Sequence, residues 1–219
     1  MARTSLILLA GYFGHGNAGD ELILRLLRGA LARDGVDVRY LSGPRPAFPG
    51  AVPRGNPRAA FTALRDARAL VLGGGELFQT RTSQRSLAAY LGLPAAMALQ
   101  RKPFWVFGVG VDPALPPYAL RATAAIVRRA RGVWVRDEAS RSALARRGVS
   151  CAVMDDTVWA LPVPAPAREA PGRRLVWIPR FPDGEGTVRR LAPLLEGLTG
   201  FDHALLPLHP AHDDPFVER

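Results

Sequence analysis

The chain has 219 residues, of which 48% are hydrophobic, and it carries a formal net charge of +10 at pH 7. This length accommodates one large domain, or one domain and part of another, and the apolar fraction is sufficient for a packed core. The single cysteine, Cys151, excludes a disulfide framework and suits a reducing cytoplasm, and no run reaches the roughly 18 apolar residues of a membrane helix. The charge favours anionic ligands. The basic residues match no nucleic-acid-binding motif, so we expect no nucleic-acid partner.

The first 27 residues predict a strand, a glycine turn and a helix. Residues 6–10 form a continuous apolar run, typical of a buried strand, and the apolar residues of 22–27 have helical spacing. Between them Gly14, Gly16 and Gly19 spell G-x-G-x-x-G. Glycines in such a turn allow positive φ and a close approach of the backbone to a ligand. The free N–H groups of the following helical turn favour an anion.

This glycine turn is not typical of a nucleotide site. A dinucleotide site needs an acidic residue at the end of the second strand, and residues 42–45 contain none. No Gly-Lys-Ser/Thr follows the glycines, so the turn is not a P-loop either. We therefore expect no cofactor. The turn is unusually polar, and its acids are equally explained as complements of the helix dipole. Its polar residues are Tyr12, His15, Asn17, Asp20 and Glu21.

The following residues alternate apolar runs with helical patterns, which predicts an α/β fold with a parallel sheet flanked by helices. Residues 42–57 are rich in Pro and Gly and are expected to form an exposed loop. Ligands of such sheets bind at the carboxyl ends of the strands, where glycines and polar residues recur at 73–83, 108–112, 136–137 and 155–156. The expected strands are 36–41, 69–72, 104–111, 133–135 and 152–154, and the expected helices are 57–67, 86–100, 117–130 and 138–147.

A Pro-rich segment divides the chain. We expect a Rossmann-like N-terminal lobe at 1–160, a linker at 161–172, and the start of a second α/β lobe at 173–219. This second part predicts one strand–helix–strand unit (175–179, 188–198 and 203–208), which is too small to bury its own core. Either this unit docks on the first lobe, or the chain is a fragment of a longer two-domain protein. We favour the fragment and therefore expect the second lobe to be incomplete. We interpret the histidines and acids of 209–214 as loop residues and expect no metal site.

Five segments follow one another in a characteristic order: 11–21 (GYFGHGNAGDE), 72–79 (LGGGELFQ) with 82–83 and 86–92, 107–113 (FGVGVDP), 135–140 (VRDEAS) and 155–156. Together they resemble the segments of the polysaccharide pyruvyl transferase family, of the type that acts on secondary cell-wall polymers in S-layer anchoring. The resemblance has three departures. His15 stands where the family commonly has an aromatic residue, and Asp112-Pro113 stands where it usually has Gly-Pro. The family's block with a further histidine and basic residue in the second lobe has no counterpart here.

The resemblance implies a two-lobed, glycosyltransferase-B-like fold with the active site in the cleft. It also implies transfer of a pyruvyl group from phosphoenolpyruvate onto a sugar of a cell-wall or surface polysaccharide precursor, as a ketal, with release of phosphate. The acceptor would be a lipid-linked or polymeric sugar, such as N-acetylmannosamine. A lipid-linked acceptor suits a cytoplasmic enzyme drawn by its charge to the inner face of the membrane.

The resemblance, together with the chemistry of the reaction, also selects site residues. Arg136 matches the family's arginine and suits a carboxylate or phosphate, although a salt bridge with Asp137 or another neighbour is the alternative. Protonation of the donor and deprotonation of the sugar need an acid and a base, for which we select Asp20 and His15. Further substrate-binding candidates are Tyr12, Asn17, Glu21, Gly74, Gly75, Gln79 and Ser83.

Two other functions remain open at this point. A nucleotide-sugar glycosyltransferase of similar fold would bind nucleotide diphosphates saturably. A non-catalytic, truncated binding protein would show no turnover even when a complete second lobe is supplied.

Overall fold

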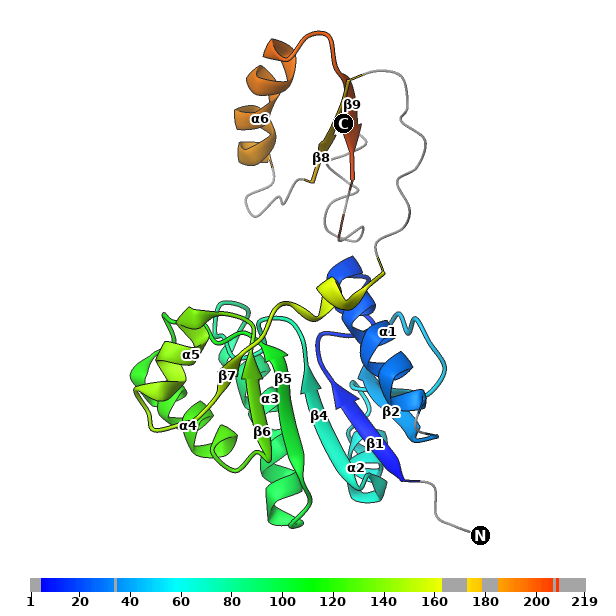
Figure 1. Ribbon diagram of the computed structural model, residues 1–219, viewed down its shortest axis with the longest axis vertical. Coiled ribbons are helices and arrows are strands. Elements are labelled where there is room, and N and C mark those ends of the chain that lie inside the picture. Colours follow the sequence, from blue (N-terminus) through cyan, green and yellow to red (C-terminus); the bar gives the residue numbers. More distant parts are fainter. Residues whose placement is uncertain (1–4, 34, 163–172, 179–184, 207, 209–219) are drawn as a thin grey trace. The chain divides into compact units, whose positions relative to one another are not determined.

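The computed structural model describes residues 5–33, 35–162, 173–178, 185–206 and 208 (Figure 1). The chain splits into two compact units, each of which is described by itself. One unit contains Met1–His15 and Gly19–Leu161, and the other contains Gly16–Ala18 and Pro162–Arg219.

The first unit is built on a seven-stranded parallel sheet with the order β3-β2-β1-β4-β5-β6-β7. In its centre, Leu8 of β1 lies opposite Arg39 of β2 on one side and Leu70 of β4 on the other. The α/β, Rossmann-like prediction is confirmed. The strands are β1 (Leu6–Ala10), β2 (Asp37–Ser42), β3 (Ala51–Pro53), β4 (Ala69–Gly73), β5 (Phe104–Val109), β6 (Gly132–Val135) and β7 (Ala152–Val153).

The strand order reverses beside β1. The chain passes outward from β1 to β2 and β3 and then returns to the other side of β1 with β4. The carboxyl ends of β1 and β4 are therefore neighbours at the switch point, the position where open α/β sheets bind their ligands. The glycine turn after β1 and the segment 74–83 after β4 both begin there.

Five helices cover the two faces of this sheet (Figure 1). Side chains alternate along β1, so Leu9 faces α1 and packs in one core cluster with Leu24 and Leu27. Leu8 points to the opposite face of the sheet and packs in the other core cluster, together with residues of α2, α3, α4 and α5. The helices are α1 (Ala18–Ala32), α2 (Pro57–Asp66), α3 (Gln84–Leu99), α4 (Pro117–Val127) and α5 (Glu138–Ala145).

The expectation of an exposed loop over 42–57 is wrong in part. Ser42 is buried at the end of β2, and Ala51–Pro53 form β3, which pairs in parallel with β2. The connection between these strands is held by the Tyr40 hydroxyl, which donates to Phe48 O at 2.7 Å and accepts from Phe48 N at 3.0 Å. A three-residue edge strand is too short to produce a hydrophobic pattern, and the surrounding Pro and Gly concealed it.

The second unit contains the predicted strand–helix–strand order. Its elements are β8 (Arg174–Trp177), α6 (Glu185–Gly197) and β9 (Asp202–Leu205), and the two strands pair in parallel. The indole Nε1 of Trp177 donates a 2.9 Å hydrogen bond to Nδ1 of His203. Most of the linker predicted at 161–172, and the whole of 209–214, lie outside the described residues. No helix of the described part is long and apolar enough to cross a membrane.

Candidate active site

The segments that follow β4 and β5 lie side by side beyond the ends of their strands. The amide of Gly110 donates to Gly75 O at 2.9 Å, Phe78 N donates to Gly110 O at 3.3 Å, and Asp112 N donates to Phe78 O at 2.9 Å. These bonds extend the β4–β5 pairing past Gly73 as a short ladder. The side chains carried by this ladder are therefore held in a defined position at the carboxyl edge of the sheet.

Arg136 is oriented by the residue that follows it. β6 ends at Val135, and α5 begins with Asp137 as its N-cap, where Oδ1 accepts from Ser140 N at 2.7 Å. The other oxygen, Oδ2, contacts Nε of Arg136 at 3.3 Å. Burial alone would raise the pKa of Asp137, but the bonds from Ser140 and Arg136 outweigh it and lower that pKa. The carboxylate therefore stays charged and anchors one edge of the guanidinium.

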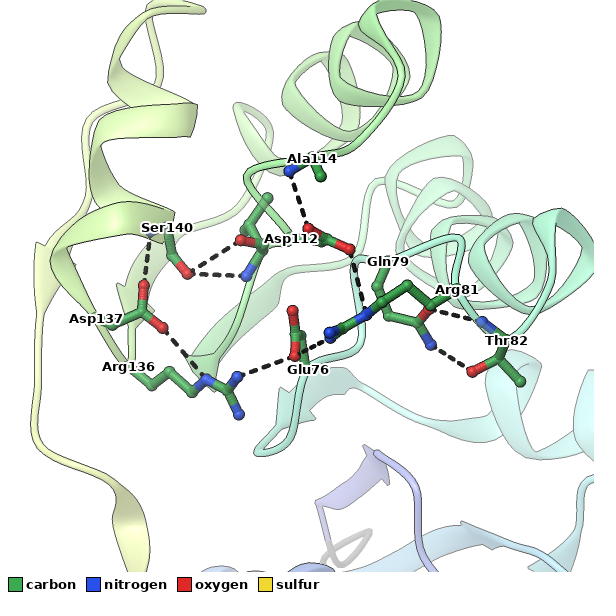
Figure 2. Close-up of polar contacts among 10 residues, drawn as sticks. Glu76, Gln79, Arg81, Thr82, Asp112, Ala114, Arg136, Asp137 and Ser140 are labelled. Atoms are coloured by element: carbon green, nitrogen blue, oxygen red, sulfur yellow. Dashed lines mark hydrogen bonds and ion pairs between the residues drawn. The ribbon is translucent and has the colours of Figure 1, made fainter. Parts of the chain in front are cut away.

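The terminal edge of Arg136 points to a second acid, Glu76, on the segment after β4. Nη2 of Arg136 lies 3.2 Å from Oε2 of Glu76, and Arg81 ion-pairs with the same oxygen. Nε of Arg81 contacts Oδ2 of Asp112 at 3.3 Å, and Oδ1 of Asp112 accepts from Ala114 N at 2.9 Å. Figure 2 shows these side chains converging from the segments after β4, β5 and β6. Arg136 therefore makes both of the salt bridges that the sequence left as alternatives to ligand binding, one with Asp137 and one with a neighbouring acid, Glu76.

Two glycines make room for the charged side chains. A Cβ on Gly110 would lie 2.6 Å from Nε of Arg136, and a Cβ on Gly75 would lie 2.9 Å from Oδ1 of Asp20. Gly75 also has φ +68°, which L side chains rarely adopt. Because the two glycines are joined by the Gly110–Gly75 hydrogen bond, Asp20 and Arg136 pack on adjoining stretches of backbone.

Asp20 is a buried carboxyl in the first turn of α1, with 9% of its surface exposed. Its pKa is raised from 3.8 to about 7, chiefly by burial and then by the charges of Glu21 and Asp156, while Arg136 opposes the rise. A carboxyl with a pKa near neutrality can both give and take a proton under physiological conditions. This is the property expected of an acid–base residue.

The glycine turn is braced from within α1. Oε1 of Glu21 accepts from Gly14 N at 2.7 Å, and Gly14 has φ +74°. The other carboxylate oxygen of Glu21 is buried and makes no hydrogen bond with any described residue. The rings of Tyr12 and His15 stack with centroids 4.2 Å apart and an interplanar angle of 10°. Predicted residues of this turn thus form a stacked aromatic pair and a bond that holds the loop.

A further polar contact at the base of this turn was not predicted from the sequence. Nη1 of Arg54 donates to the Tyr90 hydroxyl at 2.7 Å, and Nη2 donates to the carbonyl of Gly11. The Tyr90 hydroxyl also donates to Gly11 O at 3.2 Å, and the Arg54 guanidinium lies 4.7 Å above the Tyr90 ring. Arg54 follows β3, so the failure to predict this strand also hid Arg54. Tyr90 stands within the family-like segment 86–92 and could have been selected there.

The other predicted residues have different surroundings. Gln79 bonds to Thr82 through both its oxygen, at 2.9 Å, and its nitrogen, at 2.7 Å. Ser83 caps α3 by accepting from Ser86 N at 3.0 Å. Gly74 has φ +67° and abuts Ile23 of α1. Asn17 belongs to the second unit, so it is not placed relative to these residues. The site therefore brings together Asp20, Gly75 and Arg136, and it adds Glu76, Arg81 and Asp112.

The sequence model of the family described as polysaccharide pyruvyl transferase matches residues 17–219. The chain belongs to the polysaccharide pyruvyl transferase family. Membership supports a transferase that acts in pyruvyl transfer to a polysaccharide. A comparison with curated proteins finds no significant match.

Three solved structures have low similarity to this family member. A mutant of the esterase AlinE4 is 13% identical with a TM-score of 0.33, covering 90% of this chain and 97% of its own. A Schiff-base-forming fructose-1,6-bisphosphate aldolase is 13% identical with a TM-score of 0.30, covering 98% and 93%. An archaeal fructose 1,6-bisphosphate aldolase is 14% identical with a TM-score of 0.31, covering 99% and 94%. TM-scores this low do not indicate a shared fold.

Proposed function

We propose that the protein transfers the pyruvyl group of phosphoenolpyruvate onto a sugar of a cell-wall or surface polysaccharide precursor, as a ketal, and releases phosphate. Family membership supports the reaction class. The observation that carries the proposal is the pairing of a near-neutral carboxyl, Asp20, with an oriented guanidinium, Arg136, on adjoining glycines at the switch point. This arrangement supplies a proton and an anion contact within one small region.

The reaction sets the requirements for these groups. The methylene carbon of phosphoenolpyruvate gains a proton, and its neighbouring carbon is attacked by one sugar hydroxyl, which loses a proton. The bond from that carbon to the phosphate oxygen then breaks, and a second hydroxyl of the sugar forms the second ketal bond and gives up its proton. Overall one proton from the diol ends on the new methyl group and the other leaves with phosphate, so no oxidant, reductant or cofactor is required.

We propose that Arg136 binds the anionic donor, phosphoenolpyruvate. A guanidinium can bind a carboxylate or phosphate with two parallel hydrogen bonds, and charge-assisted bonds of this kind are among the strongest in proteins. Asp137 fixes the Nε edge, so the terminal nitrogens already point in one direction before the donor arrives. Such preorganisation reduces the entropy lost on binding. Gly74 and Gly75 are the backbone groups that we expect closest to the donor.

We assign proton transfer to Asp20 and His15. Asp20 with a pKa of about 7 is substantially protonated at neutral pH and can donate to the methylene carbon. His15 is the base for the sugar hydroxyl, because a neutral imidazole nitrogen can accept a proton. Its ring stacks on Tyr12, which offers the apolar face on which a sugar ring can pack. Asn17, Glu21, Gln79 and Ser83 remain candidate contacts to the substrates.

The proposal also includes the acceptor and the location. A lipid-linked or polymeric sugar is the expected acceptor, and the enzyme would work in the cytoplasm at the inner face of the membrane. The net charge of +10 supports an attraction to anionic lipid. We further propose that residues 1–160 form the N-terminal lobe, that 161–172 form a linker, and that 173–219 belong to a second α/β lobe.

The test is donor binding followed by turnover in the full-length native protein. Calorimetry should show saturable binding of phosphoenolpyruvate, weakened at least about tenfold by Arg136→Ala because charge-assisted hydrogen bonds are lost. Arg141→Ala is the matched control, since Arg141 lies on α5 and makes an exposed ion pair with Glu138. With a lipid-linked N-acetylmannosamine acceptor, phosphate release should depend on the acceptor. Equal affinities in both variants would rule out the role of Arg136.

A further inference from the structure

We propose that Arg81 and Arg136 together form one anion-binding site, and that the carboxylate of Glu76 occupies this site until an anionic ligand displaces it. The inference rests on the proposed function, because it describes how the same region receives a carboxylate or phosphate. It adds a second anion ligand, Arg81, and it assigns Glu76 the role of an internal competitor.

The two arginines are anchored in the same way. Nε of Arg81 contacts Asp112 at 3.3 Å, and Nε of Arg136 contacts Asp137 at 3.3 Å. Each of these carboxylates uses its other oxygen to accept a backbone N–H: Asp112 from Ala114 at 2.9 Å, and Asp137 from Ser140 at 2.7 Å. Both guanidinium groups are therefore fixed along the Nε edge and have their terminal nitrogens directed elsewhere.

The loops that carry these anchors are also joined to each other. The Ser140 hydroxyl accepts from Val111 N at 2.9 Å, which ties the start of α5 to the segment after β5. The Gly110–Gly75 and Asp112–Phe78 bonds tie that segment to the one carrying Glu76 and Arg81. The segments that carry the two arginines are consequently joined by hydrogen bonds.

The free edges of the two guanidinium groups meet at one atom. Nη2 of Arg136 lies 3.2 Å from Oε2 of Glu76, and Nη2 of Arg81 contacts the same oxygen (Figure 2). Two cations that converge on one carboxylate oxygen form the arrangement that binds the oxygens of carboxylates and phosphates. A ligand oxygen placed at this point would gain both contacts.

Of the three carboxylates around the arginines, Glu76 is the one suited to leave. Asp112 is buried with 7% of its surface exposed, and Asp137 is fixed as a helix cap. Glu76 follows two glycines with positive φ, and its side chain keeps 24% exposure. The Arg81 side chain is 65% exposed and the Arg136 side chain 32%, so a ligand can reach both from solvent.

If an anionic ligand displaces Glu76, substitution of Glu76 should change anion affinity in a direction that a purely structural ion pair would not produce. Glu76→Gln retains the size of the side chain but removes the charge that competes with the ligand. If Glu76 is a competitor, this variant binds anions more tightly, whereas a residue that merely positions Arg136 would produce weaker binding when changed. Arg81→Ala removes one of the two ligands and weakens binding, and Arg81→Lys restores the charge without the two-nitrogen fork.

The experiment is calorimetric titration of the full-length protein with phosphoenolpyruvate and, separately, with inorganic phosphate. We expect Glu76→Gln to bind roughly 3- to 10-fold more tightly and Arg81→Ala about 10-fold more weakly, with Arg81→Lys between wild type and Ala. Arg85→Ala is the matched control, because Arg85 is an exposed arginine near the start of α3 and its loss changes net charge equally. Circular dichroism confirms that each variant is folded.

The outcomes separate this inference from the proposed function. Weaker binding in Glu76→Gln, or equal binding in Arg81→Ala and Arg85→Ala, overturns the inference. If Arg136→Ala alone abolishes donor binding, the proposed function survives and the role of Arg81 does not. Binding of phosphate with no binding of phosphoenolpyruvate supports the arginine pair but contradicts the proposed donor. Binding of neither probe by the wild-type protein overturns both.

Discussion

The amide of Gly110 donates a 2.9 Å hydrogen bond to the carbonyl of Gly75, and this bond joins the backbone beneath Arg136 to the backbone beneath Asp20. The two glycines are 35 positions apart in the sequence and follow neighbouring strands, β5 and β4. The proposed anion ligand, Arg136, and the acid–base candidate, Asp20, thus pack against one pair of hydrogen-bonded peptide groups. A Cβ added at either glycine would lie within 3 Å of one of these side chains, so neither position has room for a side chain.

Gly110→Ala should displace Arg136. The added Cβ would lie 2.6 Å from Nε and 2.9 Å from Cζ, so the guanidinium must move away from Asp137 and Glu76. We expect affinity for phosphoenolpyruvate to fall about tenfold, measured by calorimetry. Gly92→Ala is the control: Gly92 lies in α3, a Cβ added there would meet no atom within 4 Å, and Ala should stabilise that helix by up to about 1 kcal/mol. Unchanged donor affinity in Gly110→Ala would contradict the packing argument.

Asp20 should make the folding stability depend on pH in a predictable direction. Its pKa is about 7 in the folded chain and 3.8 for an ordinary aspartate, so between these values the folded chain binds more protons than the unfolded chain. The contribution of Asp20 to the free energy of unfolding therefore falls as pH rises through this window, by at most about 1.4 kcal/mol per pH unit, and levels off above it.

Denaturant unfolding of wild type and Asp20→Asn at several pH values measures this effect. The neutral amide does not titrate, so the stability of Asp20→Asn relative to wild type should increase from about pH 4 to pH 7 and then remain constant. Asp66→Asn is a control, since Asp66 makes an exposed ion pair with Arg65. A stability difference that does not vary with pH would show that Asp20 is charged throughout.

Tyr90→Phe should destabilise the fold at Gly11, the residue that follows β1. The variant removes the hydroxyl that accepts from Arg54 and donates to Gly11 O, which leaves Arg54 with an unpaired donor beside the buried Tyr90 ring. We expect a loss of about 1–3 kcal/mol in the free energy of unfolding. Tyr118→Phe, at a tyrosine with 57% exposure, should change it by less than about 0.5 kcal/mol. Similar changes in the free energy of unfolding for the two variants would mean that the Arg54–Tyr90 hydrogen bond does not stabilise the fold.

His15→Phe distinguishes proton transfer from stacking. Phenylalanine retains a ring that can stack on Tyr12 but has no nitrogen to accept a proton. If His15 is the base, the acceptor KM should remain near the wild-type value while kcat falls about 100-fold or more. A kcat within a few-fold of wild type would assign His15 to sugar stacking alone. Steady-state kinetics with a saturating donor gives both constants.

The sequence allowed the sheet to be predicted because its central strands are continuous apolar runs that end in glycine or polar residues. The run at 6–10 therefore matches β1, and the runs at 69–72 and 104–111 overlap β4 and β5 to within two residues at their ends. The edge strand β3 was not predictable in this way, because three residues carry no period. The choice of Arg136 came from the resemblance of its segment to the family.

The parts of the site that depend on tertiary contact could not be obtained from the sequence. Nothing in the spacing of Arg81 and Asp112 indicates that they pair, because the contact depends on the ladder between the segments after β4 and β5. The high pKa of Asp20 likewise depends on burial and on Asp156, which lies 136 positions away in the sequence. In the sequence Asp20 differs little from any acid in a first helical turn.

Pyruvyl transfer can be followed through the donor's own carbon. The full-length protein is incubated with phosphoenolpyruvate carrying carbon-13 at the carbon that bears the phosphate, together with a lipid-linked N-acetylmannosamine acceptor, and the products are observed by NMR. A pyruvyl transferase moves the label to a saturated ketal carbon on the acceptor, with one phosphate released per label, and Arg136→Ala lowers both signals at subsaturating donor. If the label stays in phosphoenolpyruvate while a nucleotide sugar supplied instead glycosylates the same acceptor, the protein is not a pyruvyl transferase.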